Sequence, residues 1–146
     1  KSNQFKELEK FLAFWPVDVP LAVEFRDESW FENNVFNEVQ DLLKQYGVIP
    51  VITDTPGRRD VVHFKITNDQ LFVRYVGDFA HPSDLYRTAN WINRIGELCE
   101  IGVNKVWFYV HQPGENRERI LGFFNNMIPQ INQSLSLDIP LLKNYS

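Results

Sequence analysis

The sequence has little of what several common protein classes require. It contains one cysteine, Cys99, which excludes an internal disulfide and a cysteine-based zinc site. Cys99 lies in a helix-like stretch, where we expect a small buried apolar group. No apolar run approaches the roughly 18 residues that cross a bilayer, and no signal-peptide pattern opens the chain. The formal net charge of −4 argues against nucleic acid or an anionic membrane as a partner, since both attract basic surfaces.

Sequence motifs for cofactors and activated nucleophiles are also missing. The chain has no GxxxxGK[ST] loop, no GxGxxG, no HExxH and no nucleophile elbow, so no named cofactor is expected. What remains is an ordinary globular composition, with 44% hydrophobic residues in 146. A chain of this length buries about two-thirds of its unfolded surface. We therefore expect one soluble, cytoplasmic domain.

Four short apolar segments stand out, and each ends in charged or polar residues. Nearly continuous apolar runs are typical of strands that are buried on both faces of a parallel sheet. Parallel α/β proteins bind their ligands at the carboxyl ends of such strands. The four segments are 20–26, 48–54, 71–77 and 105–112.

Helical periodicity separates the apolar segments. Apolar residues at steps of three and four predict helices over 3–15 and 32–46, one from Ser83 to the residue before Gly102, and one over 115–127. This alternation predicts an α/β fold with a parallel sheet and right-handed crossovers. The pattern does not choose between a small open sheet and half of an eight-stranded barrel. It also leaves the stretches 55–70 and 134–146 without an assigned structure.

The strand segments carry a resemblance to a known family. The run Val-Glu-Phe-Arg-Asp-Glu-Ser-Trp-Phe at 23–31 resembles a signature of the domain of unknown function 72 family, also called YecE-like, whose opening glycine-tryptophan motif is absent here. The similarity continues, in the family's order, through 51–54, 72–77 and 106–112. The chain departs from the family pattern at Val76, where a histidine is common, and at 110–112, where Phe-Asn-Asn is common.

The resemblance implies a TIM-barrel-like fold with parallel βα repeats similar to strands five to eight. The whole chain, 1–146, is then a single domain that forms the C-terminal half of a barrel domain. Such a half has two unpaired, apolar outer strands, which invite pairing. We expect either self-association or a missing N-terminal half to cover these edges. The family's activity is not established, so the resemblance implies no reaction.

Five charged or imidazole side chains lie at the strand ends: Glu24, Arg26, Asp54, Arg74 and His111. A charge within a buried strand is costly unless it is paired or functional, so we expect these groups to converge at one end of the sheet. Glu24, Asp54 and His111 are the candidate catalytic residues, because paired carboxylates and a histidine can move protons. The alternative for each is structural: an ion pair, a turn cap or a surface hydrogen bond.

The candidate ligand-binding residues are Arg26, Arg74, Arg58, Arg59, Trp30 and Gln112. Glu24 and Asp54 balance Arg26 and Arg74, and the further arginines leave a positive surplus. Guanidinium groups match phosphate and carboxylate, so the surplus favours a small anionic ligand. A divalent ion on Glu24, Asp54 and His111 is a weaker alternative, because the arginines would have to stay out of its coordination shell.

Two classes of function follow from these residues. One is an enzyme that acts on a small phosphorylated or carboxylated metabolite at the carboxyl ends of the strands. The other is a non-catalytic binding or scaffold domain whose polar strand ends form a structural charge network. Barrel precedent favours the enzyme only by analogy.

Overall fold

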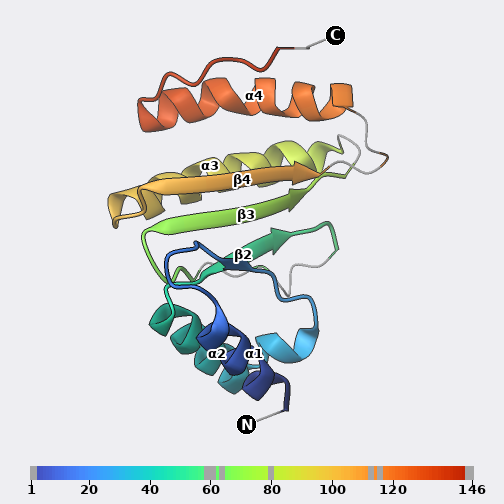
Figure 1. Cartoon of the computed structure of the whole chain (residues 1–146). Helices are drawn as coiled ribbons and strands as arrows, with labels where there is room; N and C mark the ends of the chain where they lie inside the picture. Colours follow the sequence, from blue (N-terminus) through green and yellow to red (C-terminus); the bar gives the residue numbers. More distant parts are fainter. Residues whose placement is uncertain are drawn as a thin grey trace.

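The computed structural model describes residues 3–57, 62, 65–78, 81–111, 114 and 117–143. Over these residues the fold is α/β, with one four-stranded sheet in the order β1-β2-β3-β4 (Figure 1). Every pair of neighbouring strands is parallel. The elements are α1 (Asn3–Phe14), β1 (Ala22–Val23), the 3-10 helix η1 (Glu28–Phe31), α2 (Asn33–Gln45), β2 (Ile49–Asp54), β3 (Gln70–Val76), α3 (Pro82–Glu100), β4 (Lys105–His111) and α4 (Arg117–Leu135). The prediction of a parallel α/β fold is confirmed.

The predicted elements differ from the observed ones at two places. The first strand was predicted over 20–26, but only Ala22–Val23 pairs with β2. Beyond Val23 the chain leaves the sheet and forms η1. Asp27 caps the start of η1, because the Asp27 side chain accepts a hydrogen bond from the backbone N–H of Ser29 at 3.0 Å. The last helix was predicted to end at Met127, but α4 continues through Pro129 to Leu135.

Tertiary contacts explain why α4 survives an internal proline that would normally end or kink it. Met127 and Ile128, just before Pro129, are buried. The tail after α4 runs back along the helix (Figure 1). The Asn132 amide exchanges two hydrogen bonds with the backbone of Ile139, both at 2.9 Å, and Asn125 does the same with Leu142 at 2.8 and 3.1 Å.

The core has two parts, one at each end of the sheet. Alternate residues of β3 face α3 and pack there with helix side chains in a cluster that includes Leu71, Val73, Tyr75, Trp91, Ile95 and Leu98. At the other end α1 and α2 lie next to β2 (Figure 1) and form a cluster that includes Leu12, Val39 and Leu43. The expectation that Cys99 is buried is wrong, because Ile95 and Leu98 take the sheet-facing side of α3 and leave Cys99 exposed.

The face of the sheet opposite α3 carries larger and more polar side chains than the face that packs against α3. Register pairs Arg74 with Tyr109 and Val76 with His111, so these side chains share one face. Tyr109 is 53% exposed and stacks on Phe72 at 5.0 Å between ring centroids. We call this side, with Thr53, Phe72, Arg74, Tyr109 and His111, the open face. In the described part of the chain, no helix is long and apolar enough to cross a membrane.

The two outer strands generate a test of assembly. In the described sheet β1 and β4 each pair on one side only, and unpaired edges of apolar strands promote association. We predict that the 146-residue chain by itself self-associates, whereas a preceding N-terminal half would cover the same edges. Light scattering over a concentration series should give a mass above that of one chain. A stable monomer at high concentration would contradict this.

Candidate functional site

Three of the predicted residues come together at the carboxyl end of the open face. Glu24 lies at the centre, and Thr53 Oγ1 donates a hydrogen bond to its Oε1 at 2.8 Å. Arg26 Nη2 donates to Oε2 at 3.1 Å, and Arg74 Nη1 donates to Oε1 at 3.4 Å. We call Glu24, Arg26, Thr53 and Arg74 the mouth cluster. Arg74 therefore has a carboxylate partner, which offsets the cost of a charge within a buried strand.

The members of the mouth cluster differ in their access to solvent. The side chain of Glu24 is 18% exposed, that of Arg74 35% and that of Arg26 76%. Partial burial raises the pKa of Glu24, but the hydrogen bonds from Thr53 and Arg26 and the charges of Arg74 and Arg26 outweigh it. The net result is a pKa below the ordinary 4.5. Glu24 is therefore an ionised carboxylate at neutral pH and acts as an acceptor, not as an acid.

Asp54 does not join this cluster, and the expectation that it converges with Glu24 is wrong. Thr53 and Asp54 are consecutive residues of β2, so their side chains point to opposite faces of the sheet. Thr53 reaches Glu24 on the open face, whereas Asp54 is 1% exposed beneath α3. A metal site shared by Glu24, Asp54 and His111 is contradicted by this geometry. No other group of three His, Cys, Asp or Glu side chains in the described residues could hold a metal ion.

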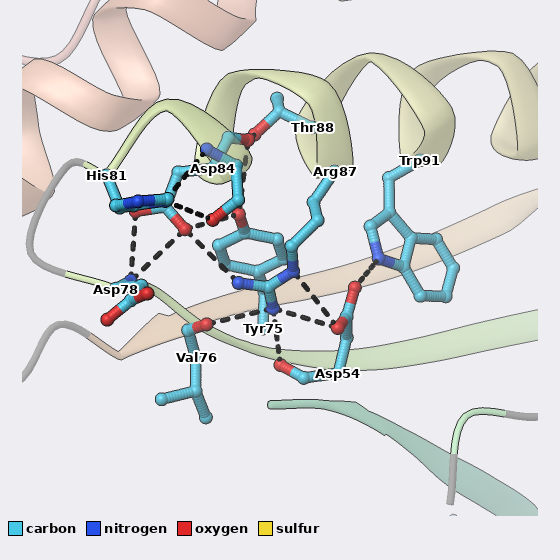
Figure 2. A network of polar contacts seen from close by, with 10 residues as sticks. Asp54, Tyr75, Val76, Asp78, His81, Asp84, Arg87, Thr88 and Trp91 are labelled. Atoms are coloured by element: carbon cyan, nitrogen blue, oxygen red, sulfur yellow. Dashed lines mark hydrogen bonds and ion pairs between the residues drawn. The ribbon is translucent and has the colours of Figure 1, made fainter. Parts of the chain in front are cut away.

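Asp54 is instead part of a buried polar network with α3 (Figure 2). Arg87 donates to Asp54 Oδ1 from Nε at 3.2 Å and from Nη2 at 2.8 Å. Its Nη2 also contacts the carbonyl oxygens of Asp54 and Val76, at 3.0 and 2.9 Å. Trp91 Nε1 donates to the other Asp54 oxygen at 2.8 Å. We call Asp54, Tyr75, Asp84, Arg87 and Trp91 the buried network.

Asp84 is the second carboxylate of the buried network. Its Oδ1 accepts a bond from Arg87 Nη1 at 3.1 Å, and its two oxygens lie 3.1 and 2.9 Å from the backbone nitrogen of Asp78. The Tyr75 hydroxyl lies 3.2 Å from both Asp84 Oδ1 and the Asp84 carbonyl oxygen. Burial raises the pKa of Tyr75 far above its ordinary value of 10, so the hydroxyl stays protonated and donates. This network ties α3 to β2 and β3.

Sequence reasoning missed Asp84, Arg87 and Thr88, although their spacing carried a signal. Asp84, Arg87, Thr88 and Trp91 stand at i, i+3, i+4 and i+7, which places them on one face of a helix. That face also holds the buried Ile92 and Ile95. Polar residues on the apolar stripe of a helix need buried partners, and Asp54 was the obvious acceptor at the adjacent strand end.

Of the other predicted site residues, the structure describes Trp30 and His111. Trp30 belongs to η1 and packs against Phe25, with ring centroids 5.1 Å apart, on the cluster beneath α1 and α2. His111 ends β4, is exposed and shares the open face with Arg74. Arg58, Arg59 and Gln112 lie outside the described residues. Tyr109, next to Arg74 in register, is a residue of the open face that the sequence analysis did not single out.

Comparison with protein families identifies the chain. The model of the family described as "Protein of unknown function DUF72" matches residues 1–129. The chain belongs to the DUF72 family. A comparison with curated proteins found no match.

Solved DUF72 structures have the same fold. A DUF72 family protein from Enterococcus faecalis superposes with a TM-score of 0.68 at 18% identity, over 94% of this chain and 57% of that one. A DUF72 family protein from Thermotoga maritima gives a TM-score of 0.63 at 19% identity, over 94% of this chain and 54% of that one. The chain thus spans little more than half the length of these relatives. Its assignment as half of a barrel stays a prediction.

The buried network generates a stability test. We predict that Arg87→Met lowers the free energy of unfolding by about 3–5 kcal/mol, because it leaves two buried carboxylates without their cation. Glu97→Gln is the control: Glu97 pairs with Arg94 on the exposed side of the same helix, and its loss should cost about 0.5 kcal/mol or less. Urea denaturation measures both variants. Equal losses would contradict a structural role for the network.

The mouth cluster generates a test of pH dependence. The folded-state pKa of Glu24 is lowered, so its ionised form stabilises the fold above pH 4.5. That contribution is lost as the pH falls through the folded-state pKa. We predict that the stability difference between the parent chain and Glu24→Gln shrinks as urea denaturation is carried from neutral pH to below 4.5. Glu7→Gln, at an exposed ion pair on α1, is the control. A difference that grows on acidification would contradict the assignment.

Proposed function

We propose that the mouth cluster of this DUF72 chain binds a small anionic metabolite through a phosphate or carboxylate group. The observation that supports the proposal is one carboxylate, Glu24, shared by two guanidinium groups, Arg26 and Arg74. The proposal concerns residues 1–146 as one domain, taken as the C-terminal half of a TIM-barrel-like fold.

The charge balance of the open face favours an anion. Arg26 and Arg74 contribute two positive charges and Glu24 one negative charge, which leaves a surplus of one positive charge in the mouth cluster. Asp54 would cancel it, but Asp54 faces α3 and pairs with Arg87. The surplus therefore exists without Arg58 or Arg59, although the chain as a whole is acidic.

The accessibility of the two arginines suits ligand capture. Arg26 is largely exposed, so its side chain can turn toward a ligand at little cost, because an exposed ion pair contributes about 0–1 kcal/mol. Arg74 is more enclosed and lies beside Tyr109 on the sheet. A guanidinium presents paired N–H groups that match two oxygens of a phosphate or carboxylate.

If the bound metabolite is also a substrate, proton transfer is the reaction step that these residues can supply. Glu24 is ionised at neutral pH and is the candidate base, and His111 on the same face is the candidate acid or base. Asp54 is not a candidate for proton transfer, because its carboxylate is engaged by Arg87 and Trp91.

One observation favours the alternative of a non-catalytic domain. Glu24 accepts hydrogen bonds from Thr53, Arg26 and Arg74, so its carboxylate is engaged by side chains of this chain. In this alternative the three side chains form a charge network that links β1, β2 and β3 at their carboxyl ends.

Calorimetric titration separates the two functions. We predict that phosphate, sulfate or a simple sugar phosphate binds the parent chain, and that Arg74→Gln weakens binding at least about tenfold, as expected for a lost charge-assisted hydrogen bond. Arg94→Gln, on the exposed side of α3, is the control and should bind like the parent. No heat and no thermal shift at millimolar ligand would favour the charge network. Binding that survives loss of both Arg26 and Arg74 would place the site elsewhere.

A further inference from the structure

Aromatic side chains gather on the open face beside the arginines of the mouth cluster. Phe72 belongs to β3, and Trp107 and Tyr109 belong to β4. The parallel register places Phe72 opposite Trp107, and Arg74 opposite Tyr109. Because alternate residues of a strand share one face, these side chains form two adjacent rows across the sheet. The row nearer to the carboxyl ends of the strands holds Arg74 and Tyr109.

The same row continues to Glu24. Thr53 on β2 pairs in register with Arg74, and the Thr53 hydroxyl donates to the Glu24 carboxylate. Neighbouring strands of a sheet lie about 4.8 Å apart. From β2 to β4 the row therefore presents a hydroxyl, a guanidinium and an aromatic ring at single-strand steps. The Tyr109 ring is thus the immediate neighbour, on β4, of any anion that Arg74 holds.

Tyr109 is the accessible ring among these aromatic side chains. It is 53% exposed, against 38% for Trp107. Lys105 Nζ lies over the Trp107 ring, 4.8 Å from its centroid, and Trp107 Nε1 donates to Gln70 at 3.3 Å. Trp107 is therefore engaged by its neighbours and lies one row further from the arginines. A ligand at the mouth cluster meets Tyr109 first.

Phe72 supports the Tyr109 ring from one side. The two rings are stacked, with centroids 5.0 Å apart and an angle of 9° between their planes. The exposed part of Tyr109 lies away from Phe72, where a further flat ring can extend the stack. Stacked aromatic rings attract each other beyond the burial of their surface. A ring that the protein already holds in place loses little freedom when a ligand binds.

We propose that the anion bound by the mouth cluster carries a planar aromatic ring, which stacks on Tyr109. This inference rests on the proposed function, because Arg26 and Arg74 hold the anionic group in both. The ligand class is an aryl phosphate or an aromatic carboxylate, with the charged group only a few bonds from the ring. Such a short connection matches the single-strand step from Arg74 to Tyr109. Tyr109 then sets the preference for a ring-bearing anion.

Titration of the 146-residue chain with inorganic phosphate, phenyl phosphate and cyclohexyl phosphate tests the inference. Phenyl phosphate should bind at least about threefold more tightly than cyclohexyl phosphate, whose ring is similar in size but is not planar and cannot stack. Inorganic phosphate, which has no ring, should bind more weakly than phenyl phosphate. Equal binding of phenyl and cyclohexyl phosphate would overturn the stacking inference and leave the anion site of the proposed function in place. No binding of any probe would overturn both.

Substitution of Tyr109 separates the ring from the anion site. Tyr109→Ala should abolish the preference for phenyl phosphate and leave the binding of inorganic phosphate unchanged, whereas Tyr109→Phe keeps the ring and should keep the preference. Tyr86→Ala is the matched control, because Tyr86 is a 71% exposed tyrosine on α3, and this variant should bind like the parent. Thermal unfolding shows whether each variant folds. A preference for phenyl phosphate that persists in folded Tyr109→Ala would overturn the inference.

Proton NMR of phenyl phosphate gives a second readout on the parent chain, without any substitution. The phenyl protons should shift upfield on binding, because a ring stacked on Tyr109 lies within the shielding region of the tyrosine ring current. Bound phenyl phosphate without an upfield shift would overturn the stacking inference.

Discussion

The ion pair between Asp54 and Arg87 is the interaction on which the arrangement of this half of the fold depends. A buried guanidinium needs acceptors for its N–H groups, and Arg87 finds them on Asp54, on the backbone of Val76 and on Asp84. Its acceptors come from the ends of β2 and β3 and from α3 itself, so they fix where the helix begins relative to the sheet. The second carboxylate, Asp84, shares Arg87 with Asp54 and is further stabilised by hydrogen bonds with the backbone N–H of Asp78 and the Tyr75 hydroxyl.

Successive side chains of β2 point to opposite faces of the sheet, and this alternation separates the mouth cluster from the buried network, whose charged residues look alike in the sequence. Thr53 supports Glu24 on the open face, and Asp54 holds Arg87 on the helix face. A slip of one residue in the register would exchange these faces and leave Arg87 without its partner, so the buried pair also specifies the register. The same separation leaves the mouth cluster with two guanidiniums for one carboxylate. The positive surplus of the open face is thus a consequence of how the opposite face is stabilised.

The sequence predicts the alternating elements well, because apolar periodicity reports burial directly. It predicts the two faces of the sheet poorly. In β2 the residues are buried or half-buried throughout, so periodicity does not reveal that Thr53 and Asp54 diverge. The partners of Asp54, Arg87 and Trp91, lie 33 and 37 residues further along the chain. They belong to α3, where the apolar residues dominate the sequence pattern of the helix. Where α4 continues past Pro129, the side chains of Asn125 and Asn132 bind the tail, and local propensity does not register such contacts.

Hydrogen bonds that satisfy Glu24 do not by themselves make the mouth cluster purely structural. Its three donors are unequal: Thr53 and Arg74 are half-buried parts of the sheet, whereas Arg26 is mostly exposed and bonds from beyond the end of β1. If an anion binds Arg26, Glu24 keeps the hydrogen bonds from its two half-buried donors, Thr53 and Arg74. The half-buried part of the cluster is then unchanged. The exchange replaces one exposed ion pair with another and costs little. In the proposed function an anion and the charge network share these residues, and the position of Arg26 would distinguish the ligand-bound state from the free one.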